Sequence, residues 1–134
     1  MIYLTLVGIV LLGALASLLF GWFWYSGKAF GPIWMKEMGM AKPDISGGAL
    51  KKMMIKMLAC GFGAELLKSF CLLFLSVGLG INQFFLAFVL WLGFMVPILL
   101  NTVIYEKRSW KLFMIHGGYQ LLSLFVIDLV FFLI

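Results

Sequence analysis

Residues 83–105 read QFFLAFVLWLGFMVPILLNTVIY and contain no charged side chain. A helix of about 20 apolar residues crosses the roughly 30 Å hydrocarbon core of a bilayer, so this segment is predicted to span a membrane. The whole chain shares this character, because 65% of its 134 residues are hydrophobic and only 11% are charged. Soluble domains carry about 25% charged residues. The composition therefore excludes an ordinary soluble domain.

Three more segments are apolar over a similar length, although the second of the four carries two charges. Together the four predicted spans cover about residues 2–25, 53–79, 83–105 and 112–134, within a single transmembrane domain of residues 1–134. The second and third connections are short, so they join neighbouring spans into antiparallel hairpins. The sequence thus predicts an all-α fold, an integral membrane four-helix bundle.

The first connection is longer and carries an amphipathic pattern at about residues 28–40. Its apolar residues recur at helical spacing, and charged residues fill the other side. This pattern is typical of a short helix that lies in the headgroup region of a bilayer. Tryptophan and tyrosine concentrate at the membrane interface. The expected interfacial anchors are Trp24, Tyr25, Trp34 and Trp110.

Lysine and arginine residues are distributed unevenly among the three connections. Those in or beside the first are Lys28, Lys36, Lys42, Lys51, Lys52 and Lys56, and those in or beside the third are Lys107, Arg108 and Lys111. The second connection, at residues 79–83, has none. Because cytoplasmic loops carry the excess of Lys and Arg, connections 1 and 3 are predicted to be cytoplasmic. Both termini of this multi-pass protein of the plasma (inner) membrane then lie outside the cytoplasm.

Small residues predict where the helices pack closely. Gly13, Ser17 and Gly21 follow four-residue spacing, so they form one smooth stripe on the first span. Such stripes let helix backbones approach each other, which replaces the hydrophobic drive that lipid cancels. The stripe could face another span or a second copy of the chain, and we favour the second copy. In the third span, Pro97 removes a backbone donor, so a helix kink is expected there.

Polar residues at a similar depth form the candidate site. Glu65 and Lys68 are three residues apart in the second span, so they can pair on one helix face. At about 1.5 Å per residue, Glu65 and Gln120 both lie about 13 Å from the flanking lysines. Asn101 and His116 lie shallower, about 7–9 Å from the cytoplasmic ends of their spans. These five residues are the candidates for a ligand-binding site or an ion pathway.

Two interpretations of Glu65 and Lys68 stay open. Isolated charges inside a membrane cost roughly 2.5–3.5 kcal/mol each, and ionisable residues there often mark transport pathways. A carboxylate and an ammonium on one helix also neutralise each other, and Asn, Gln and His commonly join helices. The layer is therefore either functional or a structural pair with supporting hydrogen bonds.

Other site chemistries find little support in the sequence. His116 is the single histidine, and no second histidine or suitably spaced cysteine joins it, so no metal site is expected. Cys60 and Cys71 are too far apart along one helix to bridge, and both are expected as small apolar core residues. Asp128 lies about 25 Å from Lys111, near the outer boundary, so it forms no catalytic dyad with His116. No catalytic residue, cofactor or nucleic-acid partner is predicted.

Short aromatic and glycine motifs resemble those of a known family. They are Trp24-Tyr25, Phe30-Gly31, Trp34, Gly39, Trp91-Leu92-Gly93-Phe94, Pro97, Trp110-Lys111-Leu112-Phe113 and Gly118-Tyr119-Gln120. Their combination, spread over nearly the whole chain, is similar to that of small, mostly bacterial four-helix membrane proteins catalogued only as a domain of unknown function. The resemblance implies a four-span layout and implies no activity.

The functional prediction rests on the polar layer. We predict a small oligomeric binding or permeation unit for a polar solute or ion, surrounded by the lipid bilayer and by further copies of the chain. The alternative is a non-catalytic accessory or structural subunit of a larger membrane protein complex. An enzyme is the least favoured class, because no nucleophile motif, phosphate loop or pair of carboxylates is present.

Overall fold

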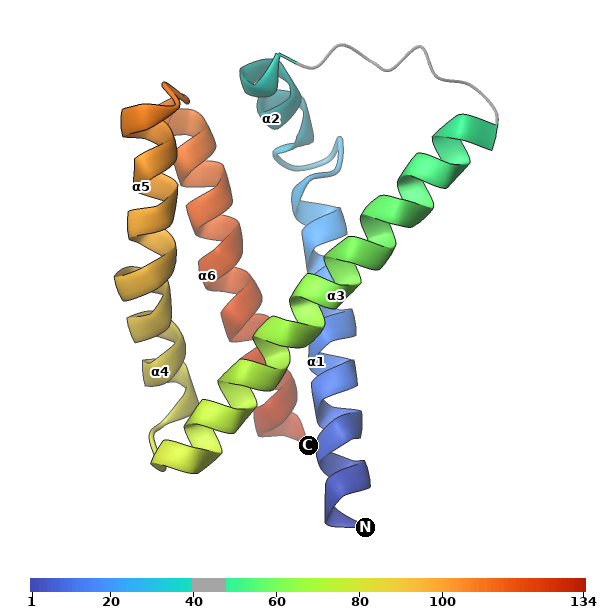
Figure 1. The fold of residues 1–134 in the computed structure, drawn as a ribbon, viewed down its shortest axis with the longest axis vertical. Helices are drawn as coiled ribbons and strands as arrows, with labels where there is room; N and C mark the ends of the chain where they lie inside the picture. The colour runs from blue at the N-terminus through green and yellow to red at the C-terminus, as the bar shows by residue number, and fades with distance from the viewer. Residues whose placement is uncertain (40–47) are drawn as a thin grey trace.

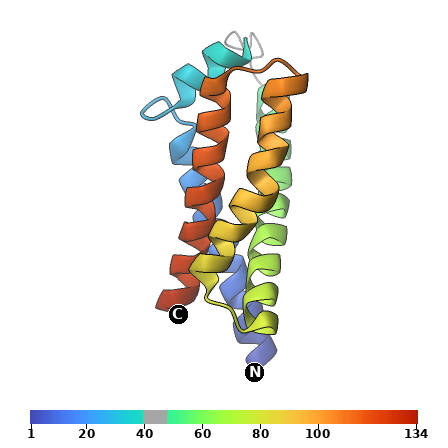
Figure 2. The ribbon, with the colours of Figure 1, turned by 90° about the vertical axis from the view of Figure 1, so that its left-hand side faces the viewer.

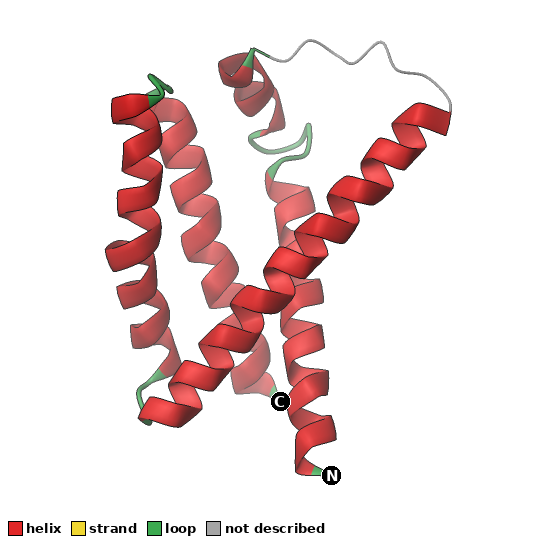
Figure 3. Ribbon diagram, viewed as in Figure 1, coloured by secondary structure: helices red, strands yellow, loops and turns green. Residues whose placement is uncertain are grey.

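The computed structural model describes residues 1–39 and 48–134, and these residues form helices and loops without any strand (Figures 1 and 3). In chain order the elements are α1 (Ile2–Trp24), α2 (Gly31–Met38), α3 (Gly48–Leu79), α4 (Gln83–Leu90), η1 (Trp91–Met95), α5 (Val96–Tyr105) and α6 (Trp110–Leu133). The predicted all-α class is confirmed. The last residue of the predicted interfacial segment, at position 40, lies outside the described residues, as does Lys42.

Four helices of the described chain are long and apolar enough to span a membrane: Ile2–Trp24, Ile55–Leu79, Gln83–Tyr105 and Trp110–Leu133. Their bounds agree with the predicted spans to within two residues at every end. The third span combines α4, η1 and α5 into one continuous rod (Figure 1). The protein is therefore a multi-pass membrane protein whose outer surface contacts lipid.

The two ends of the bundle differ in what they carry. Both termini lie at one end, together with the turn between α3 and α4, and we call this the terminal end (Figures 1 and 2). The opposite end holds α2 and the connection between α5 and α6, which contains Lys107 and Arg108. We call it the basic end. This arrangement is the one that the antiparallel hairpins predict.

Polar side chains set the starts of two spanning helices. Asn82 caps α4, because its Oδ1 accepts hydrogen bonds from the N–H groups of Phe84 and Phe85 at 3.0 and 3.2 Å. Gly80 has a φ of +63°, which closes the tight turn from α3. Ser109 caps α6 in the same way, accepting from the N–H of Leu112 at 3.2 Å. The two hairpins are thus encoded locally.

The helix that contains Pro97 changes type just before the proline. Residues Trp91–Met95 form a π-helical turn, in which the N–H of Val96 donates to the carbonyl of Trp91. Proline lacks the donor that a regular helix needs at the next position, so the wider turn accommodates the missing bond. Trp91 Nε1 donates to the carbonyl oxygen of Gly117 at 2.9 Å, which fixes this segment against α6.

The small-residue stripe of α1 is used inside the chain. Gly13, Ser17 and Gly21 are all buried, and α1 packs against α3 and α6. A methyl group on Gly13 would lie 2.8 Å from Ser69 Oγ, and one on Gly21 would lie 2.7 Å from Tyr119 Oη. The interpretation of this stripe as a contact with a second copy is therefore wrong, because α3 and α6 already occupy it.

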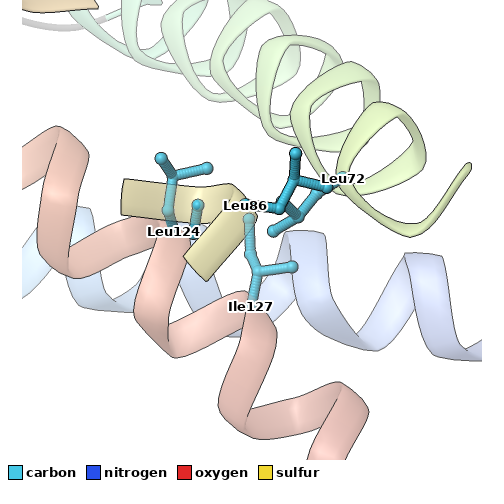
Figure 4. Packing of buried hydrophobic residues seen from close by; sticks show 5 residues of the cluster. Leu72, Leu86, Leu124 and Ile127 are labelled. Atoms are coloured by element: carbon cyan, nitrogen blue, oxygen red, sulfur yellow. The ribbon is translucent and has the colours of Figure 1, made fainter. Parts of the chain in front are cut away.

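An apolar cluster closes the bundle toward the terminal end. It joins α3, α4 and α6 through Leu72, Leu86, Ala87, Leu124 and Ile127. Figure 4 shows Leu72 and Leu86 facing the side chains of Leu124 and Ile127. Every member is at most 6% exposed, so this half of the bundle is tightly packed.

The N-terminal half of α3 diverges from the bundle. Figure 1 shows α3 crossing α1 obliquely, with its N-terminal half directed away from the other spans. The side chains at positions 55–60 are all exposed. Cys60 and Cys71 are exposed too, so their prediction as core residues is wrong. Both are apolar enough to face lipid, which the sequence could not distinguish from a protein core.

Candidate functional site

The Glu65–Lys68 pair forms where α3 crosses α1. Lys68 Nζ lies 3.0 Å from Glu65 Oε2 and 3.2 Å from Oε1, as the three-residue spacing predicts. The Glu65 side chain is 9% exposed and the Lys68 side chain is 14% exposed. The two charges therefore neutralise each other in a protein interior rather than in water.

Two neighbouring helices donate hydrogen bonds to the carboxylate of Glu65. Ser17 of α1 donates to Oε2 at 2.5 Å, and Tyr119 of α6 donates to Oε1 at 2.8 Å. Both oxygens thus have a hydroxyl partner in addition to the ammonium. The close approach of the three backbones, which the stripe on α1 allows, is what brings these groups within reach.

The ammonium of Lys68 also has a partner for each of its three protons. Besides Glu65, Nζ donates to Gln120 Oε1 at 3.1 Å and to Ser123 Oγ at 2.7 Å. It lies 5.4 Å from the centre of the Tyr119 ring, within range of a cation–π interaction. The six residues of this central network are Ser17, Glu65, Lys68, Tyr119, Gln120 and Ser123. Three spanning helices contribute to it, and its charges are fully compensated.

His116 belongs to a second cluster, one turn closer to the basic end. Its Nδ1 lies 2.7 Å from the hydroxyl of Tyr25, which follows α1 directly. The Tyr25 ring meets the rings of Trp34 and Tyr119 edge-on, each at 5.3 Å between centroids. Burial raises the pKa of Tyr25 above its ordinary range, so its hydroxyl stays protonated. Tyr119 thus connects the His116 cluster to the central network by ring contact.

Asn101 and Pro97 do not join the polar residues. Both are exposed on the α5 rod and face away from the central network. Asn101 lies at a depth close to that of His116, but it is on the exposed side of α5. The structure therefore brings together four of the five candidate residues in two adjacent clusters and leaves Asn101 outside them.

The predicted interfacial anchors divide into two kinds. Trp24 Nε1 donates to the carbonyl of Ile115 at 3.1 Å, and Trp34 packs against Tyr25, so these three rings join α1 and α2 to α6. Trp110 is 61% exposed and points outward. Trp110 therefore has the exposed position expected of a membrane anchor. The other three side chains hold the basic end together.

Four polar residues of the described interior were not among the predicted site residues: Ser69, Tyr119, Ser123 and Asp128. Tyr119 donates to Glu65. Its position three residues after His116 and next to Gln120 was the signal in the sequence, because it places a hydroxyl at the depth of Glu65. Ser69 donates to the carbonyl of Val10 at 3.0 Å, which strengthens the α1–α3 contact. Asp128 is fully buried, although its sequence position lies near the outer boundary of the span.

A family described as "Protein of unknown function (DUF1761)" has a sequence model that matches residues 9–132. The chain belongs to this family. The match contains both clusters and nearly the full length of the four spans, so the described fold is that of the family domain. No curated protein and no solved structure matches the chain significantly. In the part of the chain that the structure describes, no three His, Cys, Asp or Glu residues are grouped as a metal site.

Proposed function

We propose that the protein is a small permeation unit that carries protons across the membrane through its central network. The observation that supports this most is the buried pair of Glu65 and Lys68 at mid-membrane depth, bonded to side chains from two other helices. Ionisable residues at such depth are rare and commonly belong to proton or ion pathways. A titratable pair linked to several hydroxyl groups is a suitable relay for protons.

The closed geometry of the network favours a proton over a larger cargo. Its members contact one another directly, at 2.5–3.2 Å. Two cavities of about 450 and 500 Å³ are lined by other residues. A solute or hydrated ion would have to separate these groups, whereas a proton moves between groups that are already hydrogen-bonded. The smallest cargo therefore fits this site best.

The central step is a proton transfer within the pair. Movement of one proton from Lys68 Nζ to Glu65 Oε2, 3.0 Å away, converts the ion pair into a neutral amine and a neutral acid. The amine can then accept a proton through Ser123, on the side toward the terminal end. The acid can release its proton toward the basic end. Because of the positive charges there, we infer that the basic end faces the cytoplasm of the plasma (inner) membrane.

Proton flux into proteoliposomes tests this function. Purified protein is reconstituted into vesicles with an internal pH-sensitive dye, and a potassium diffusion potential drives proton uptake. We expect Glu65→Gln and Lys68→Met to lower the flux at least tenfold, because each removes a titratable step. Asn101→Ala serves as the control, since its side chain is exposed outside both clusters. Flux equal to that of protein-free vesicles, or unchanged flux in the double variant, would refute the proposal.

A non-catalytic accessory subunit is the second candidate. It is favoured by the exposed N-terminal half of α3, where Ile55, Met57 and Leu58 are 56, 59 and 45% exposed. A second copy of the chain or a larger membrane complex could cover this half of the helix. In that case the central network serves only to hold α1, α3 and α6 together. Purification in mild detergent would then yield a homo-oligomer or a stoichiometric partner, and vesicles would show no flux.

A further inference from the structure

α6 carries one acidic side chain, Asp128, and the central network does not use it. It is 0% exposed, and neither of its carboxylate oxygens has a hydrogen-bond partner among the described residues. Glu65 is the opposite case, since it accepts from three side chains. An ionised carboxylate buried without any partner is very costly, and such a group avoids the cost by binding a proton.

The elements around Asp128 supply no cation to compensate it. α4, which packs against α6, carries no titratable side chain along Gln83–Leu90. The titratable groups in the terminal half of the other packed helices are the N-terminal amine and Tyr3 of α1 and Glu65, Lys68 and Cys71 of α3. Met1, which carries the N-terminal amine, and Tyr3 are 102 and 82% exposed, and Cys71 is exposed. Lys68 is committed to its three acceptors.

A cavity at the terminal end lies about one helical turn from Asp128 along α6. It has a volume of about 500 Å³ and mixed polar and apolar walls, which include Ser76, Asn82 and Gln83. Phe131 and Phe132 also line it, and these residues follow Asp128 by one helical turn on the same face of α6. Gln83 lines the cavity and also contacts Asp128, because its Nε2 donates to the backbone carbonyl of Asp128 at 3.0 Å.

We propose that Asp128 is a proton-binding site that exchanges protons with the solution at the terminal end through this cavity. In the protonated state the carboxyl carries no charge and gains an O–H donor. Along α6 it lies about 7.5 Å from Ser123, on the terminal side of the central network. Its role as the first acceptor of a transmembrane proton path rests on the proposed function. The protonated state itself does not, since it follows from burial and the missing partners.

Carbodiimide labelling tests the site directly. A protonated carboxyl transfers its proton to a nitrogen of the carbodiimide, its oxygen adds to the central carbon, and an acyl shift to nitrogen yields a stable N-acylurea. We treat the wild-type protein in lipid vesicles at neutral pH with dicyclohexylcarbodiimide and map the adduct by peptide mass spectrometry. We expect near-complete modification of Asp128, falling at least tenfold at alkaline pH, and little at Glu65. Asp128→Asn should show no adduct at position 128.

Access through the cavity has its own measurement. A water-soluble carbodiimide added outside vesicles should modify Asp128 when the terminal end faces out, and Gln83→Leu should slow this reaction several-fold. Unmodified Asp128 at every pH, or preferential modification of Glu65, would overturn the inference. Labelled Asp128 in a protein without proton flux refutes the proposed function alone, whereas flux without labelling refutes the proton site alone.

Discussion

Lys68→Met removes the cation of the central network and keeps a side chain of similar length. Glu65 then retains the hydroxyls of Ser17 and Tyr119 but loses the ammonium at 3.0 Å. Removal of one partner of a buried ion pair costs about 3–5 kcal/mol, because the remaining charge stays buried. Gln120 and Ser123 also lose their donor. We expect Lys68→Met to lower the free energy of unfolding by about 3–5 kcal/mol.

The double variant Glu65→Gln with Lys68→Met shows whether the loss comes from the uncompensated charge. A Gln side chain at position 65 still offers an oxygen to Ser17 or Tyr119, and no charge is left in the interior. Uncharged replacements of a buried pair are often close to neutral in stability. We therefore expect the double variant to be more stable than Lys68→Met alone, with a coupling energy of about 2–3 kcal/mol.

The assay is reversible unfolding in mixed detergent micelles, followed by tryptophan fluorescence for the wild type, both single variants and the double variant. Lys56→Met is the matched control, because Lys56 is exposed on the same helix, and it should change stability by less than about 0.5 kcal/mol. A cost of Lys68→Met below about 1 kcal/mol would mean that the pair behaves like a surface salt bridge. Additive costs in the double variant would refute the coupling.

Two further predictions concern the packing of α1 and of η1. Gly21→Ala should lower the free energy of unfolding by about 1–3 kcal/mol, because the new methyl group would lie 2.7 Å from Tyr119 Oη. Gly8→Ala is the control and should not destabilise the protein, because position 8 has open space around it. Equal losses in the two variants would contradict the close packing at Gly21. Trp91→Phe should cost about 0.5–1.5 kcal/mol, because it removes the indole hydrogen bond to α6. The exposed Trp110→Phe is its control in the same unfolding assay, and a similar loss in both would contradict the role of that bond.

The spans were predictable because lipid imposes a strong and simple requirement on the sequence. A run of apolar residues of sufficient length, such as residues 83–105, has few other stable locations. The pair of Glu65 and Lys68 was predictable for a similar reason, because side chains three residues apart lie on one helix face. Local caps at Asn82 and Ser109 also fix where two of the helices begin. These features depend on neighbours along the chain.

Features that depend on which helices meet were not predictable from one sequence. The stripe of Gly13, Ser17 and Gly21 indicates a close contact, but any smooth surface could have filled it, and α3 and α6 do so. Asn101 shows the same difficulty, since depth along a helix does not determine which side faces the bundle. Lipid and a protein interior are equally apolar, so hydrophobicity alone cannot separate the two sides of a span.

α6 unites these observations, because its polar residues meet a different helix at each depth. His116 meets Tyr25 after α1 at the basic end, the central network meets α3, and Asp128 meets α4 through Gln83 at the terminal end. The two carboxyl groups in this series have opposite environments. The Glu65 carboxylate accepts from an ammonium and two hydroxyls, whereas the carboxyl oxygens of Asp128 have no donor among the described residues. If protons pass along α6, the two carboxyls should act at different steps, Glu65 within the relay and Asp128 at the entry from the terminal end. Glu65→Gln should abolish the relay, while Asp128→Asn should slow uptake from the terminal end more than from the basic end.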